Sequence, residues 1–72
     1  MIRKGSKVMW KWGSGEAEGK VIDTFSTKIT KTIKGSKITR KGEKDNEALY
    51  IEQANGDKVL KLENEVNRKT KD

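Results

Sequence analysis

Short runs of alternating hydrophobic and polar residues, separated by glycine-containing turns, make up most of the chain. Residues two apart on an extended strand point to the same face, so each run sorts its hydrophobic residues to one side. The pattern predicts five strand-like runs and no sustained helix. The runs are Lys7–Trp12, Glu16–Phe25, the hairpin Lys28–Gly42, Glu47–Gln53 and Lys58–Leu62.

The first two runs each place a row of mainly hydrophobic residues on one face. In Lys7–Trp12 the row consists of Val8, Trp10 and Trp12. In Glu16–Phe25 it consists of Ala17, Gly19, Val21 and Phe25. Gly19 leaves room for a close neighbour or permits a sharp bend. Such bends allow a small sheet to curl on itself.

The run Lys28–Gly42 reads as a hairpin that turns at Gly35-Ser36, because glycine readily adopts the positive φ of a tight hairpin turn. This turn would set Lys34 opposite Lys37 and Ile33 opposite Ile38. The isoleucines then share one face. The other face carries Lys28, Thr30, Thr32, Lys34, Lys37, Thr39 and Lys41.

Asn55-Gly56 is a strong signal for a two-residue hairpin turn. It would set Ile51 against Leu60 and Leu49 against Leu62. The following segment, residues 63–66, is expected to add a helical turn whose Val66 plugs an open end. We therefore expect one domain over residues 1–66 and a frayed basic tail over residues 67–72, which has nothing to bury.

A meander of short, bent strands favours a small closed or half-closed barrel, since closure removes most free strand edges. The predicted fold class is all-β, a single small barrel with a short C-terminal helical turn. The chain has no proline, so glycines and bulges must supply the bends. The expected core is Val8, Trp10, Val21, Ile33, Ile38, Leu49, Ile51, Leu60 and Leu62.

The composition argues against an enzyme. The chain has no cysteine and no histidine, so it offers neither a disulfide nor a thiolate or imidazole metal site, and we expect no cofactor. Its acids Glu16, Glu18 and Asp23 lie on an exposed sheet, where water solvates them easily, and they do not form the buried carboxylate pair that acid–base catalysis usually recruits. No hydrophobic run approaches the ~20 residues that span a bilayer. Lack of cysteine fits a reducing cytoplasm, the expected location.

The charge is unevenly distributed. The net charge is +6, and residues 1–42 hold eleven Lys and Arg against three acids, while residues 43–72 hold six against eight. A positive field of this kind suits a polyanion. The predicted nucleic-acid contacts are Lys28, Lys34, Lys37, Arg40 and Lys41. The alternative is that these lysines only keep an exposed strand edge solvated.

The aromatic residues serve either the core or a binding site. Trp10, in the middle of its strand, is the better core candidate. Trp12 and Tyr50 form a candidate aromatic rim on which a nucleobase can stack. A cage for methylated lysine usually needs three or four rings, and this chain has only four aromatics, some of which must fill the core.

An ordered set of motifs covers nearly the whole chain: K-G-x-K-V, W-x-W-G-S-G, A-E-G-K-V, T-I-K-G followed by T-R, and D-N-x-A before I-E-Q-x-x-G-D-x-V-L-K. In this order the motifs resemble the hypervirulence-associated Tudor-like domain family of small bacterial and fungal proteins. The resemblance implies a five-stranded SH3-like barrel of Tudor type, which agrees with the small all-β barrel predicted from the pattern, and it implies no established activity. Glu47 stands where the family often has proline, and Tyr50 follows one place later than usual.

These observations together favour a non-catalytic binding module. Its leading partner is nucleic acid, contacted through the phosphate backbone by the basic hairpin with little sequence specificity. The alternative is a protein-interaction module that recognises a peptide or another protein. An acidic peptide would use the same lysines, so charge alone does not separate these two functions.

Overall fold

The computed structural model describes residues 2–68 of the chain, and within them nearly all regular structure is β-strand. The strands are β1 (Lys7–Trp12), β2 (Gly15–Phe25), β3 (Lys28–Ile33), β4 (Ser36–Lys41), β5 (Ala48–Gln53), β6 (Lys58–Leu62) and β7 (Asn67–Arg68). A single 3-10 turn, η1 (Glu63–Glu65), lies between β6 and β7. The all-β prediction is confirmed.

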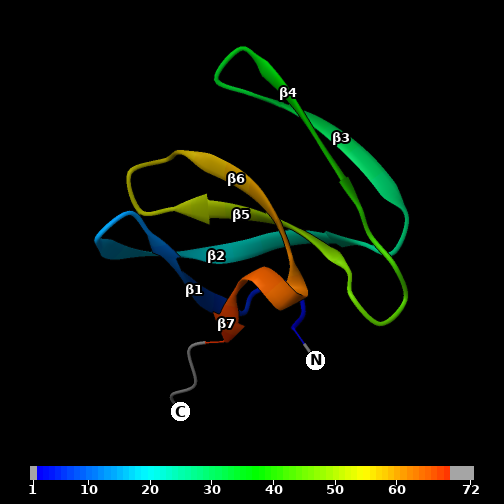
Figure 1. Ribbon diagram of the computed structural model, residues 1–72, viewed down its shortest axis with the longest axis horizontal. Coiled ribbons are helices and arrows are strands. Elements are labelled where there is room, and N and C mark those ends of the chain that lie inside the picture. Colours follow the sequence, from blue (N-terminus) through cyan, green and yellow to red (C-terminus); the bar gives the residue numbers. More distant parts are fainter. Residues whose placement is uncertain (1, 69–72) are drawn as a thin grey trace.

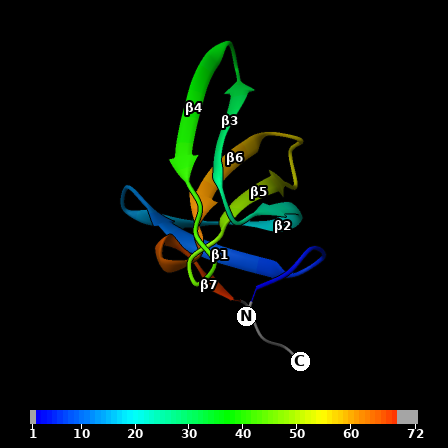
Figure 2. The ribbon, with the colours of Figure 1, turned by 90° about the vertical axis from the view of Figure 1, so that its right-hand side faces the viewer.

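The strands form two separate hydrogen-bonded units. Five of them make an antiparallel sheet in the order β6-β5-β2-β1-β7, and β3 and β4 form a hairpin of their own. Figures 1 and 2 show this hairpin standing away from the larger sheet. Both of its strands contact β6. Of the two predicted forms, the closed barrel is therefore wrong, because no ladder joins the hairpin to the five-stranded sheet within residues 2–68.

The larger sheet curls at β2, where two features bring it close to β5. A β-carbon added at Gly19 would meet the Ile51 Cγ2 at 2.5 Å and the Glu52 carbonyl oxygen at 2.8 Å. The predicted close neighbour of this glycine is thus strand β5. Further along, a bulge between Val21 and Asp23 adds one residue to β2. One extra residue moves every later side chain to the other face, so Phe25 does not share the face of Val21 as predicted.

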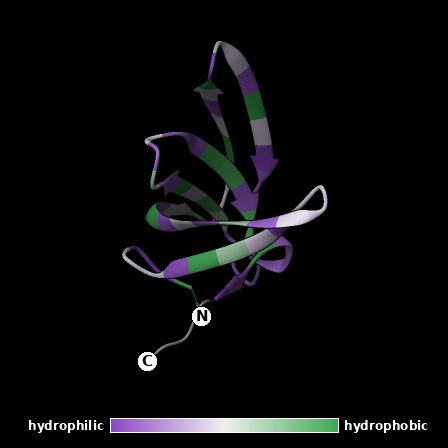
Figure 3. Ribbon diagram, turned by 90° about the vertical axis from the view of Figure 1, so that its left-hand side faces the viewer, coloured by the Kyte–Doolittle hydropathy of each residue, from purple (hydrophilic) through white to green (hydrophobic). Residues whose placement is uncertain are grey.

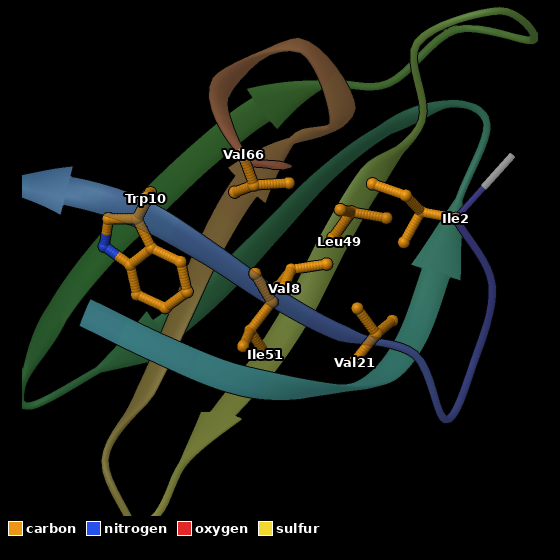
Figure 4. Packing of buried hydrophobic residues seen from close by; sticks show 7 residues of the cluster. All are labelled: Ile2, Val8, Trp10, Val21, Leu49, Ile51 and Val66. Carbon is orange, nitrogen blue, oxygen red and sulfur yellow. The ribbon is translucent and has the colours of Figure 1, made fainter. Parts of the chain in front are cut away.

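One core lies on the concave face of the sheet. It consists of Ile2, Val8, Trp10, Val21, Leu49, Ile51 and Val66. Figure 4 shows Val8 at the middle of this cluster, with Trp10 at one end and Ile2 at the other. Val66, which was expected to plug an open end of the barrel, is buried in this cluster. Ile2, which precedes the first strand, was not among the expected core residues.

The turn between β5 and β6 differs from the predicted two-residue turn. Glu52 pairs with Lys58, and the Gln53 amide donates to the Asp57 carbonyl, which leaves three residues in the loop. Gly56 has a φ of 92°, as the last position of such a loop requires. The register therefore shifts by one residue, and Leu60 pairs with Tyr50 instead of Ile51. Leu60 is still buried, but outside the main cluster.

The turn between β3 and β4 also differs from prediction. The two residues at the turn are Lys34 (φ 51°) and Gly35 (φ 79°), and Ile33 pairs with Ser36. The predicted pairs are wrong, but the change in register is two residues. Side chains alternate with a period of two, so the predicted faces survive. The isoleucines share one face and are half-buried, as is Leu62, so Ile33, Ile38 and Leu62 are not fully buried core residues.

The C-terminal segment is tied to the sheet. The helical turn η1 is where it was predicted, and the Glu65 Oε1 accepts a hydrogen bond from the Leu62 amide at 2.8 Å. Asn67 and Arg68, which were assigned to the frayed tail, pair with Met9 and Val8 as strand β7. Residues 69–72 lie outside the described residues.

Candidate nucleic-acid interface

The outer side of the β3–β4 hairpin presents three cross-strand pairs of polar side chains. Lys28 lies opposite Lys41, Thr30 opposite Thr39, and Thr32 opposite Lys37. We call these six residues the basic face. All six are exposed. The two central threonine hydroxyls share a hydrogen bond of 2.8 Å. Figure 3 shows hydrophilic and hydrophobic residues alternating along both strands, as a two-sided hairpin requires.

The lysines of the basic face have no acidic partner. Lys28, Lys37 and Lys41 form no ion pair within residues 2–68, and Lys28 and Lys41 are directly opposite each other. Like charges in this position destabilise a sheet slightly, and a bound anion relieves that repulsion.

The lysines of the larger sheet contrast with these. Lys11 lies opposite Glu16 and Lys20 lies opposite Glu52, so acidic residues lie among the lysines on the surface of the larger sheet. The basic face is therefore the better anion site.

Two residues predicted for the site, Arg40 and Tyr50, do not lie on the basic face. Arg40 shares the isoleucine face, where its guanidinium lies 3.5 Å from the Glu65 carboxylate. Its Nε is buried and has no hydrogen-bond partner among the residues that the structure describes. Tyr50 lies beneath the Lys31 ammonium, which is 5.0 Å from the centre of the tyrosine ring. Arg40 and Tyr50 thus help to attach the hairpin to the sheet, and neither is part of the basic face.

Lys34, also predicted for the site, lies in the turn and joins the hairpin tip to the next hairpin. Its Nζ is 2.9 Å from the Asp57 Oδ2. This hydrogen bond from Lys34 is the main cause that lowers the pKa of Asp57 from 3.8. The side-chain amide of Asn55 also donates to the Asp57 carboxylate, and its oxygen accepts from the Asp57 amide. The tip is therefore held in a defined position above the β5–β6 turn.

A groove of about 650 Å³ runs between this tip and the concave face of the sheet. We call it the tryptophan groove. Its walls include Trp10, Trp12, Ile33, Lys34, Val59 and Lys61. Trp10 is 4% exposed and Trp12 is 73% exposed, which matches the expected division between core and rim. Tyr50 is not among the lining residues, so the structure does not bring the two predicted rim aromatics together.

A family model for the hypervirulence associated proteins TUDOR domain matches residues 5–66. The chain belongs to this family. The match runs from the turn before β1 through η1, so it includes both the basic face and the tryptophan groove. Neither the curated proteins nor the solved structures gave a significant match.

Membership gives this Tudor domain a fold associated with partner binding, and it leaves the partner open. Within residues 2–68, no helix has the length and hydrophobicity needed to cross a membrane.

Several groove residues of this Tudor domain were missed by sequence reasoning. Val59 and Lys61 lie on the groove side of β6 together with Asp57. The predicted two-residue turn placed these side chains on the wrong face. The run Gln53–Asp57 carries the available signal, because a glycine at the last position of the loop is also typical of the three-residue hairpin turn.

Proposed function

We propose that this Tudor domain is a non-catalytic module that binds the phosphate backbone of nucleic acid through its basic face. The observation that carries the proposal is a surface with three exposed lysines, none of which has a carboxylate partner within residues 2–68. Lysine contacts to phosphates release condensed counterions, and this release drives binding. The threonine hydroxyls between the lysines can add hydrogen bonds to phosphate or sugar oxygens.

The composition of the basic face sets the type of binding. Lysine and threonine contacts to the backbone carry no sequence information, so we expect low sequence specificity. The affinity is expected in the non-specific range, with a Kd of about 10⁻⁴–10⁻⁶ M at physiological salt. Arg40, on the opposite face and engaged with Glu65, is left out of the proposed contact surface.

A second candidate function is recognition of a peptide or protein partner. The observation that favours it is Trp12, an exposed large hydrophobic residue beside a groove, since aromatic residues are enriched where proteins bind each other. An acidic peptide would also contact the lysines of the basic face, but it would discriminate between peptide sequences and would not be displaced by DNA or RNA.

The test is fluorescence anisotropy of a labelled 12-base-pair DNA duplex at low salt. One variant replaces the three lysines of the basic face with glutamine: Lys28→Gln, Lys37→Gln and Lys41→Gln. A control variant makes the same change of charge on the larger sheet: Lys7→Gln, Lys11→Gln and Lys20→Gln. We expect the first variant to lose binding and the control to retain most of it.

Two results contradict the proposal. Equal loss of affinity in both triple variants would mean that only the net charge attracts the duplex. If the wild-type protein does not bind the duplex at low salt but binds an acidic peptide, the basic face serves the second candidate function, peptide recognition. Circular dichroism of all three proteins provides the check that they are folded.

A further inference from the structure

We infer that the tryptophan groove binds a base of single-stranded nucleic acid, with the Trp12 indole as the surface on which the base stacks. This inference deepens the proposed function and rests on it. It adds a preference for single strands over duplexes, which the basic face alone does not provide.

The Trp12 side chain is exposed, while its backbone is fixed by the sheet. It closes the regular pairing of β1 with β2, opposite Gly15, and it follows Trp10, whose side chain is fixed in the core. Gly15 has no side chain to cover the indole, and 73% of the Trp12 surface is exposed. A base that stacks on this ring removes hydrophobic surface from water without ordering a flexible loop. Every base has a π-face, so such stacking tolerates any sequence.

The walls of the groove offer polar contacts that suit a nucleotide. The Lys61 ammonium lies 6.0 Å from the centre of the Trp10 ring and pairs with no carboxylate within residues 2–68. It is available for a phosphate. Gln53 is half-buried in the groove wall, and its side-chain amide has no hydrogen-bond partner among the described residues. An amide can donate to and accept from the edge of a base.

The groove offers one lysine for an anionic ligand. Lys34, Lys58 and Lys61 line it, with the carboxylates of Glu16 and Asp57. The Lys34 ammonium is 2.9 Å from the Asp57 carboxylate, and the Lys58 ammonium is 3.5 Å from the Glu52 carboxylate. Lys61 is therefore the groove lysine that forms no ion pair within residues 2–68, and it can contact a phosphate.

The groove and the basic face lie on opposite sides of the hairpin, and both reach its tip. Lys34 lines the groove, and Lys37, three residues later, begins the basic face. A strand whose phosphates follow the basic face can therefore cross the tip and place one base on Trp12. In a duplex the bases are stacked inside the helix and their faces are covered. Only a single strand, with its bases free, can make both contacts at once.

The test compares labelled dT12 with a 12-base-pair duplex by anisotropy, and follows tryptophan emission during the dT12 titration. We expect dT12 to bind more tightly, to quench the emission and to protect Trp12 from iodide. Trp12→Ala is expected to weaken dT12 binding between about 5-fold and about 150-fold, the range for one stacked base, and to leave duplex binding unchanged. Trp12→Phe should retain most of the affinity, because a phenyl ring still stacks.

Lys11→Ala is the matched control, since Lys11 precedes Trp12 on the same strand and points to the opposite face. The inference is overturned if dT12 and the duplex bind equally and Trp12→Ala changes neither. That result leaves the basic face intact as a binding site. If neither oligonucleotide binds, the proposed function itself fails. If a poly-glutamate peptide protects Trp12 from iodide and dT12 does not, the groove is a peptide site and the inference is wrong.

Discussion

Replacing Gly19 with alanine tests the close approach of β2 and β5, which gives the sheet its curl. The new β-carbon would lie 2.5 Å from the Ile51 Cγ2 and 2.8 Å from the Glu52 carbonyl oxygen. Carbon atoms in ordinary contact are about 3.5–4.0 Å apart, so the strands must separate by about 1 Å. Ile51 is fully buried and Glu52 contributes a backbone atom, so neither can easily move away.

Overpacking of this kind costs about 1–3 kcal/mol. The alanine also restricts the unfolded chain, which returns about 0.4–1 kcal/mol where the native backbone suits it. We expect a net loss of about 0.6–2 kcal/mol, the difference between these two effects when both are taken at their low ends or both at their high ends. In a domain of this size, each 1 kcal/mol lowers the Tm by about 4–8 °C.

Gly15→Ala is the matched control. Gly15 lies on the same strand, has no atom within 4 Å of an added β-carbon and does not have a positive φ. We expect this variant to be unchanged or up to about 1 kcal/mol more stable. Urea denaturation of the two variants and the wild-type protein measures the difference. Equal stability of all three would refute the β2–β5 approach, and with it the curl on which the tryptophan groove depends.

Three further predictions concern the core, the tryptophans and the hairpin tip. Leu60→Ala should cost about 2–5 kcal/mol in urea denaturation because Leu60 is 2% exposed, and a loss below 1 kcal/mol would contradict its burial. Trp10→Ala should destabilise the domain severely while Trp12→Ala leaves it folded, and equal iodide quenching of both indoles would contradict this division. The pKa of Asp57 is lowered from 3.8, so its ion pair with Lys34 stabilises the fold above pH 3.8 and is lost as the pH falls below that value. In an acid titration, Asp57→Asn should therefore lose less stability than the wild-type protein between pH 5 and pH 2. An unchanged acid profile would refute the contact.

The sequence predicted the location of nearly every strand but not always its register. The difference lies in the turns. The Lys34-Gly35 turn places a non-glycine residue at positive φ, which the pattern gave no reason to expect, yet the error of two residues preserved the faces of β3 and β4. The β5–β6 turn has three residues and not two, and this error of one residue exchanged the faces of β6. Turn length is decided by local backbone geometry that alternation does not encode.

The candidate site was predictable to the same degree. The exposed lysines and threonines of the basic face follow directly from alternation. Arg40 alternates with them and therefore lies on the other side, where Glu65 engages it from a segment 25 residues later in the chain. The tryptophan groove joins Trp12 to Ile33 and Lys61, which come from three different strands. Such a site depends on how the hairpin lies over the sheet, and no local pattern contains that information.

The salt dependence of duplex affinity tests the central claim most directly. Three lysine contacts to phosphates predict a slope near −2.7 for the logarithm of the association constant against the logarithm of the salt concentration, from about −0.9 per contact. The triple variant of Lys28, Lys37 and Lys41 should lose nearly all of this slope, and the triple variant of Lys7, Lys11 and Lys20 should keep it. Equal slopes for the wild-type protein and the variant of the basic face would contradict the account.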